Sequence, residues 1–118
     1  MIHKIHRGEN LTADLTIYGF GHSVNNFNDV RFPGDLRNCE KCHTNGSEQL
    51  PLADNLLSVN NPRGLINPTP PITAACTACH DTKATASHAL ANITTLGEAC
   101  VTCHGPDAQF SIDKVHAR

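Results

Sequence analysis

Three copies of the pattern C-x-x-C-H constrain this chain more than any other feature of its sequence. The copies occupy residues 39–43, 76–80 and 100–104, and together they use all six Cys of the 118 residues. Two thiols three positions apart lie on one side of a helical turn, and the His that follows adds an imidazole beside them. The fold therefore has to present three such sets of side chains.

The pattern is the attachment sequence of c-type haem. The two thiols add to the two vinyl groups of the porphyrin, and the His binds the iron as its proximal ligand. The sequence therefore predicts three covalent haems c. The predicted haem-binding residues are Cys39, Cys42 and His43 for the first haem, Cys76, Cys79 and His80 for the second, and Cys100, Cys103 and His104 for the third.

Zinc binding and redox disulfides are the alternative interpretations of paired cysteines. A zinc ribbon uses two C-x-x-C pairs for each metal, so three pairs leave one over. A redox pair usually occurs singly, near a βαβ unit. Neither alternative requires His after the second Cys. With 8 His in 118 residues, chance gives that placement about 7% of the time per copy, and roughly three times in ten thousand for all three. Haem attachment is the favoured interpretation.

Five His remain as candidate distal ligands for three irons: His3, His6, His22, His88 and His116. Met1 is the only Met, so His on both sides of each iron is the predicted ligation. Such iron is low-spin and has no open position, which favours electron transfer over catalysis at the metal. His3 and His6 cannot both bind one haem iron, because axial ligands approach from opposite faces. They can bind two different irons, and the assignment of each His to a haem stays open.

The polypeptide itself offers little for a hydrophobic core. It has no Trp, one Tyr and four Phe, and hydrophobic residues make up 39% of the chain. A chain of this length buries only a modest share of its surface. We therefore predict that three apolar porphyrins replace the missing core side chains, and that the haem-free chain is largely unfolded. The predicted architecture is one triple-haem domain over residues 1–118, mostly irregular, with short α-helices organised around the covalent haems.

Local signals place short helices around the motifs. We predict helices over residues 1–7 (ending at Gly8), 73–80, 82–96 (ending at Gly97) and 100–104 (ending at Gly105), and a final helical turn with Val115 and His116. Residues 9–38 are predicted to be loop with a short strand or turn. Asp35 is the predicted N-cap of a helical turn, and residues 44–72, which are rich in Pro, are predicted to be irregular.

Charge and hydropathy exclude several classes of function. A formal net charge of -2 gives no basis for nucleic-acid binding. No apolar run is long enough to cross a membrane, and residues 1–11 lack the apolar core and cleavage site of a signal peptide. Cytochrome c maturation occurs outside the cytoplasm. We therefore expect an extracytoplasmic protein, at the outer membrane or in the periplasm, and a chain that is a fragment of a longer one.

Three stretches, residues 1–8, 32–39 and 115–118, resemble the OmcA/MtrC family, the decahaem outer-membrane c-type cytochromes of metal-reducing bacteria. Members of that family have two five-haem domains alternating with β-barrel-like domains. The resemblance covers nearly the whole chain. It implies that the chain carries the last three attachment motifs of a five-haem domain, the C-terminal one of the two. The five distal His of such a domain match the five candidates here, which implies that two haem motifs precede residue 1.

The resemblance also implies a role at the cell surface. Electrons would pass from a periplasmic donor to extracellular metal oxides, flavins or other multihaem cytochromes. Two alternatives stay open. One is a multihaem reductase of a small anion, which needs an iron with an open face and is disfavoured by the surplus of His. The other is a subunit of a cytochrome filament, in which a His is donated across the subunit interface.

Overall fold

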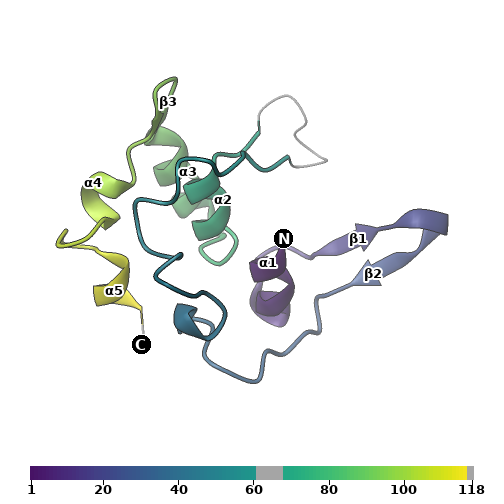
Figure 1. The fold of residues 1–118 in the computed structure, drawn as a ribbon. Coiled ribbons are helices and arrows are strands. Elements are labelled where there is room, and N and C mark those ends of the chain that lie inside the picture. Colours follow the sequence, from purple (N-terminus) through teal and green to yellow (C-terminus); the bar gives the residue numbers. More distant parts are fainter. Residues whose placement is uncertain (61–67, 117–118) are drawn as a thin grey trace.

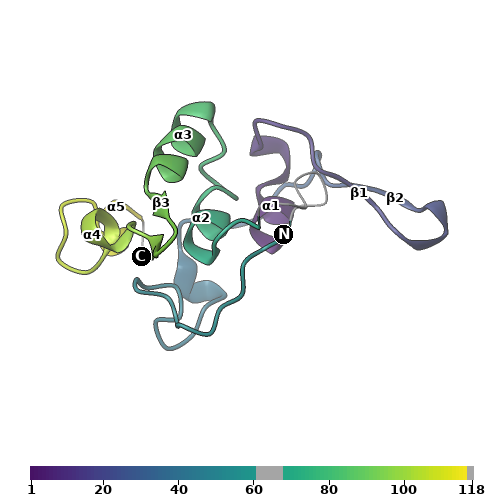
Figure 2. The same cartoon turned by 90° about the horizontal axis from the view of Figure 1, so that it is seen from above.

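The computed structural model describes residues 1–60 and 68–116, and within them the chain forms short elements joined by long irregular segments (Figure 1). The helices near the C-terminus gather on one side of the molecule, and a β-hairpin from the N-terminal part projects on the other (Figures 1 and 2). The predicted fold class, short helices in a mostly irregular chain, is confirmed for the described residues. Its organisation around haems stays a prediction.

The N-terminal helix α1 spans Ile2–Arg7 and ends at Gly8, as predicted. Gly8 has a φ of +39° and begins the 3-10 helix η1, Gly8–Asn10. A Cβ at this position would overlap the carbonyl oxygen of Val30, so only glycine permits the close approach of the two backbones. The N–H of Glu9 donates to the same oxygen at 3.1 Å. These contacts fix the end of α1 against the segment that leads to the first motif.

An antiparallel hairpin follows α1. Strand β1, Thr16–Tyr18, pairs with β2, Val24–Asn26, and Ile17 lies opposite Asn25. The 3-10 helix η2, Phe20–His22, lies in the connection between the strands. Of the short strand or turn predicted in this region, the structure shows the strand, β1. Its partner strand was not predicted, because two of the three residues of β2 are Asn, which is depleted in strands.

The first motif lies in a 3-10 helix, η3, Cys39–Lys41. The predicted N-cap, Asp35, begins the turn just before η3: its carbonyl accepts from the N–H of Asn38 at 3.2 Å. Its carboxylate accepts from the N–H of Arg37, two residues on, at 2.9 Å, as an N-cap side chain does. η3 itself follows Asn38, whose side chain does not cap it. The following stretch is irregular as predicted where the structure describes it, with one bridge between Val59 and Thr69; residues 61–67 lie outside the described residues.

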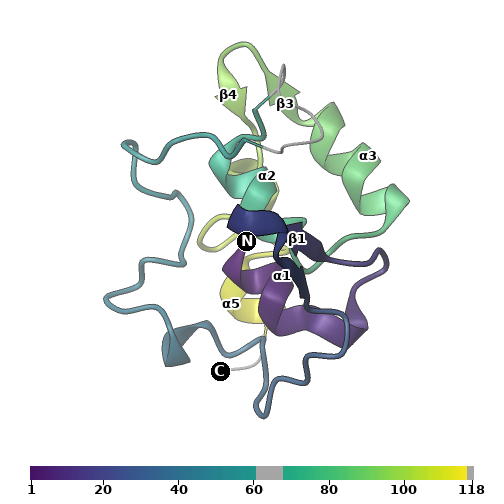
Figure 3. The same ribbon diagram turned by 90° about the vertical axis from the view of Figure 1, so that its right-hand side faces the viewer.

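Helix α2 spans Pro71–Cys76, not residues 73–80. It starts earlier than predicted because Pro71 suits the first turn and because a distant carboxylate supplies the cap. The Glu98 side chain accepts from the N–H groups of Ile72 at 2.9 Å and Thr73 at 2.6 Å. Glu98 belongs to strand β4, Gly97–Glu98, which pairs with β3, Ile93–Thr94, and Figure 3 shows this hairpin close to α2.

Helix α3 spans Lys83–Ala91 and is shorter than the predicted helix over 82–96. Thr82 caps its first turn, its hydroxyl accepting from the N–H of Thr85 at 3.2 Å. The chain then leaves the helix because Ile93–Thr94, strand β3, pairs with β4. β-Branched side chains favour this extended backbone. Gly97, with a φ of +122°, ends the hairpin turn and is not a helix stop.

The last two helices agree with prediction. Helix α4 spans Val101–His104 and ends at Gly105, and helix α5 spans Ile112–Val115 with His116 directly after it. Residues 1–60 and 68–116 contain no helix that is long and apolar enough to cross a membrane.

The protein core is very small. Among the described residues, the buried side chains are Leu50, Ala78, Thr73 and Ser111. The accessible surface is 8890 Å², whereas a folded monomer of this mass exposes about 6200 Å². The radius of gyration, 15.0 Å, also exceeds the roughly 13.5 Å expected for this length. Burial of side chains alone therefore does little to hold these elements together, as the composition predicts.

Candidate functional site

The three motifs share one backbone conformation, although they lie in different elements. In each, the carbonyl of the first Cys accepts hydrogen bonds from the N–H of the second Cys and from the N–H of the His. The six distances lie between 2.9 and 3.3 Å. The motif is thus a single helical turn wherever it occurs, and its two thiols lie on one side. The same local pattern folds the same way within η3, at the end of α2 and in α4.

The six Cys are all free. Burial raises the pKa of the Cys39, Cys79 and Cys100 thiols. Redox-active cysteines have lowered pKa values, so these thiols lack that signature. In the part of the chain that the structure describes, no group of three or more His, Cys, Asp or Glu side chains lies close enough to hold a metal ion.

Each proximal His faces one distal candidate. The ring centres of His43 and His3 are 5.8 Å apart, those of His80 and His116 are 6.0 Å apart, and those of His104 and His88 are 6.2 Å apart. A metal–nitrogen bond of about 2 Å and about 1.1 Å from nitrogen to ring centre place two trans imidazoles roughly 6 Å apart on one metal. All three pairs therefore have the spacing that a shared iron requires.

The planes of the three pairs make angles of 42°, 69° and 86°. A ring can turn about its bond to a metal, so the ring spacing carries the argument and these angles add nothing to it.

Hydrogen bonds set which ring nitrogen of these His is free. Nδ1 of His104 lies 3.0 Å from the carbonyl oxygen of Phe110, and Nδ1 of His116 lies 3.1 Å from that of Ile112. A carbonyl only accepts, so Nδ1 must carry the proton and Nε2 keeps its lone pair for a metal. Nδ1 of His43 lies 3.3 Å from the Ser47 hydroxyl. Such contacts orient imidazole ligands in metal sites.

His3 is also suited to a neutral role. Burial lowers the pKa of the His3 imidazole, and His43, the N-terminal amine and His6 lower it further. A neutral imidazole is the form that binds iron.

A cleft of about 120 Å³ lies between the second and third motifs. The cleft brings the side chains of both motifs together with one distal candidate and with apolar residues. Its lining includes Cys76 and His80, Cys100, Cys103 and His104, His88, and the apolar Leu50, Ile72, Ala89 and Ile112.

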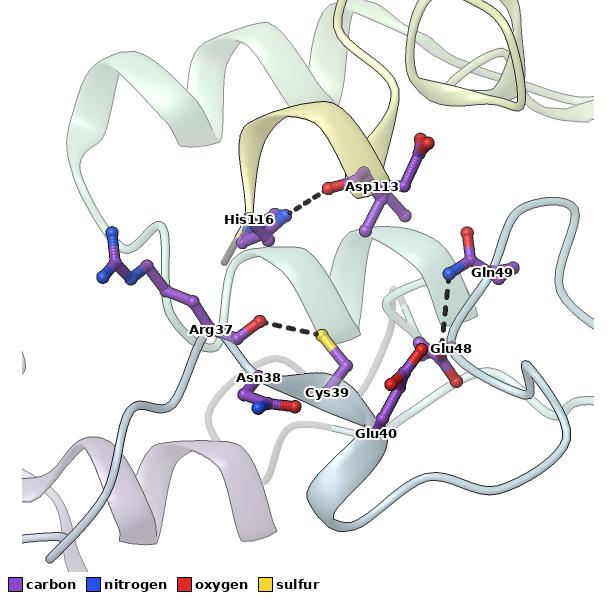
Figure 4. Close-up of a pocket in the computed structure, with 9 residues that line it drawn as sticks. Arg37, Asn38, Cys39, Glu40, Glu48, Gln49, Asp113 and His116 are labelled. Atoms are coloured by element: carbon purple, nitrogen blue, oxygen red, sulfur yellow. Dashed lines mark hydrogen bonds between the residues drawn. The ribbon is translucent and has the colours of Figure 1, made fainter. Parts of the chain in front are cut away.

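A second pocket, much smaller at about 20 Å³, lies beside the first motif (Figure 4). Cys39 lines one side of it, and its thiol donates to the carbonyl of Arg37 at 3.5 Å. His116, the residue that faces His80, lines the other side from the end of α5. The pocket therefore brings Cys39 of the first motif near the His whose ring lies 6.0 Å from that of His80.

His6 and His22 do not face a proximal His. The His6 ring lies against Phe32, with ring centres 5.0 Å apart. His22 lies in the connection of the β1–β2 hairpin with a φ of +62°. The structure therefore separates the five distal candidates into three that are paired and two that are not, and of His3 and His6 it pairs only His3.

Two carboxylates that position the site were not identified from the sequence. Glu98 caps α2, and Asp81, next to His80, accepts from the N–H of Thr12 at 2.6 Å and from its hydroxyl at 2.9 Å. These partners are 26 and 69 positions away along the chain. No local pattern marks such contacts, and only the position of Asp81 directly after a motif hints at a role.

Comparison with known proteins identifies a family. A family model described as outer membrane cytochrome MtrC/MtrF-like, domains II/IV, matches residues 1–117. Neither a curated protein nor a solved structure matches the chain significantly.

Proposed function

Because the chain belongs to the MtrC/MtrF-like outer-membrane cytochromes, we propose that it is an electron-transfer module with three covalent haems c. Family membership gives the chain an extracytoplasmic location at the cell surface, and it implies electron transport by c-type haem. The number of haems, their ligands and the redox partners are the parts that we propose. The resemblance seen in residues 1–8, 32–39 and 115–118 is confirmed at the level of the family.

The proposed attachment residues are the Cys pairs of the three motifs, with His43, His80 and His104 as proximal ligands. Support comes from the identical backbone turn of the three motifs and from their free thiols. The haem supplies an iron that takes up and releases one electron. The chain's own residues hold it, orient its axial imidazoles and limit the access of water.

The observation that carries the proposal is the pairing of each proximal His with a second His about 6 Å away. We assign His3 to the first haem, His116 to the second and His88 to the third. Two axial imidazoles leave no position for a substrate, so this arrangement suits electron transfer and not reduction of a small anion at the iron.

The second haem is proposed to lie between the other two. The pocket in Figure 4 is lined both by Cys39 of the first motif and by His116, which faces His80 of the second. The larger cleft is lined by Cys and His of the second and third motifs. These shared linings support electron exchange from first to second and from second to third haem.

The partners proposed are other multihaem cytochromes, extracellular metal oxides and flavins. Six haem propionates add about -6 to the formal charge of the chain at neutral pH, which is -2 without them. An acidic holoprotein is attracted to basic patches on a donor and to positively charged oxide surfaces. His6 and His22, which face no motif here, are proposed as distal ligands of haems that lie outside this chain.

A pair of substitutions on one helix tests the ligand assignment. His3→Ala should leave three attached haems but convert one to a high-spin ferric spectrum, because the first iron loses a ligand. His6→Ala, three residues along α1, is the matched control and should leave the spectrum wholly low-spin. Mass spectrometry checks attachment and visible spectroscopy checks the spin state. A low-spin spectrum in His3→Ala, or a high-spin band in His6→Ala, would contradict the assignment.

A further inference from the structure

Arg7 carries a positive charge, and no carboxylate of the described residues lies within hydrogen-bond distance of it. It is the last residue of α1, and its side chain is 32% exposed. Its Nε is buried and has no hydrogen-bond partner. The nearest carboxylate oxygen is Oδ1 of Asp81, 4.0 Å from Nη2. Since a guanidinium stays charged at any pH of interest and an unpartnered buried donor is costly, this placement calls for a physical reason.

Asp81 is the counter-ion of Arg7, but its hydrogen bonds go to another residue. Oδ2 accepts from the N–H of Thr12 at 2.6 Å and Oδ1 from the Thr12 hydroxyl at 2.9 Å. The Arg7 guanidinium therefore lies near an opposite charge, at more than hydrogen-bond distance from it.

The Arg7 guanidinium lies beside the second attachment motif. Asp81 directly follows His80, so a group 4.0 Å from Asp81 is close to that motif. The Cys79 thiol also senses the guanidinium: burial raises the pKa of Cys79, and the Arg7 charge opposes that rise. Arg7 and Asp81 thus form a pair of opposite charges at one edge of the second haem site.

We propose that Arg7 sets the reduction potential of the second haem, raising it above the value that the same bis-His haem would have without the cation. This inference rests on the proposed function. Reduction adds one electron, received from a redox partner, to ferric iron and removes one positive charge from the centre. A fixed cation nearby therefore favours the ferrous state, and a fixed anion disfavours it. Asp81 acts in the opposite sense, and partial burial limits screening of both charges by salt.

The test measures the three midpoint potentials of the holoprotein by spectroelectrochemical titration. Arg7→Gln should lower one of the three, Asp81→Asn should raise the same one, and Arg7→Lys should stay close to the wild type. The matched control is Arg31→Gln, because Arg31 is 81% exposed and already pairs with Glu9 at 2.8 Å; its potentials should not move. Opposite signs for Arg7→Gln and Asp81→Asn separate an electrostatic role from a structural one, which would not reverse.

A second step locates the effect. When Cys76→Ala and Cys79→Ala remove the second haem, Arg7→Gln should leave the remaining two potentials in place. Three results would overturn the inference: a shift of the two remaining potentials, unchanged potentials in Arg7→Gln, or an equal shift in Arg31→Gln. None of them would affect the proposed function, which three attached haems would still support. A chain that carries no haem would overturn both.

Discussion

At the scale of single residues, the proposed haem site divides into residues that a local pattern predicts and residues that only the fold brings together. The proposed proximal side chains follow from the C-x-x-C-H pattern, because thiols and imidazole lie within one helical turn. The proposed distal partners do not, because His3, His88 and His116 come from three helices or helix ends. Sequence reasoning found all five candidates but could not rank His3 against His6, since that depends on where α1 lies relative to η3.

Removal of one motif's thiols tests whether each motif acts independently. Cys100→Ala combined with Cys103→Ala should reduce the mass by one haem and leave two low-spin haems, because each motif forms its own turn. Intact-mass spectrometry with a ferric visible spectrum measures both. Loss of all three haems, or no loss, would show that the motifs do not attach haem one by one.

At the scale of elements, prediction succeeded where the signal was local and failed where a distant group decided the boundary. Gly8 and Gly105 end their helices as predicted. The predicted start of α2 was wrong because Glu98, from the β3–β4 hairpin, supplies its cap. The predicted end of α3 was wrong because Ile93–Thr94 pairs with β4. Both errors involve the β3–β4 hairpin, which the sequence did not predict.

The cap from Glu98 gives a stability prediction. Glu98→Ala should lower the free energy of unfolding of the holoprotein by about 1–2 kcal/mol, because two N–H groups of α2 lose their acceptor and the helix end loses an anion. Guanidinium titration followed by far-ultraviolet circular dichroism measures it. Glu9→Ala is the control. Its exposed pair with Arg31 should contribute less than about 1 kcal/mol. Equal losses in the two variants would refute the capping role.

At the scale of the whole molecule, the thin core is the main physical fact. Large apolar side chains such as Phe20, Leu57 and Leu96 are more than 80% exposed, and few side chains are buried. The composition predicted a small core, because aromatic residues make up only 4% of the chain. The arrangement of the elements could not be predicted, since haem faces rather than side-chain patterns would direct their packing.

The thin core makes a prediction about the haem-free chain. With all six Cys replaced by Ala, the protein should show no cooperative thermal transition, because most of its apolar contacts would be with porphyrin. Far-ultraviolet circular dichroism during heating measures this, with the holoprotein as the control. A sharp, native-like melt of the haem-free chain would show that the polypeptide supports its own fold.

The central claim, three bis-His haems c in one electron-transfer module, is tested most directly on the purified wild-type protein. Its intact mass and its ferric visible spectrum are measured on the same sample. The account predicts a mass increase of three haems and wholly low-spin bands, because each of His43, His80 and His104 faces a second His. A mass without haem, or with zinc in its place, would contradict it. Three haems with a high-spin component would contradict the paired ligation and indicate an open iron.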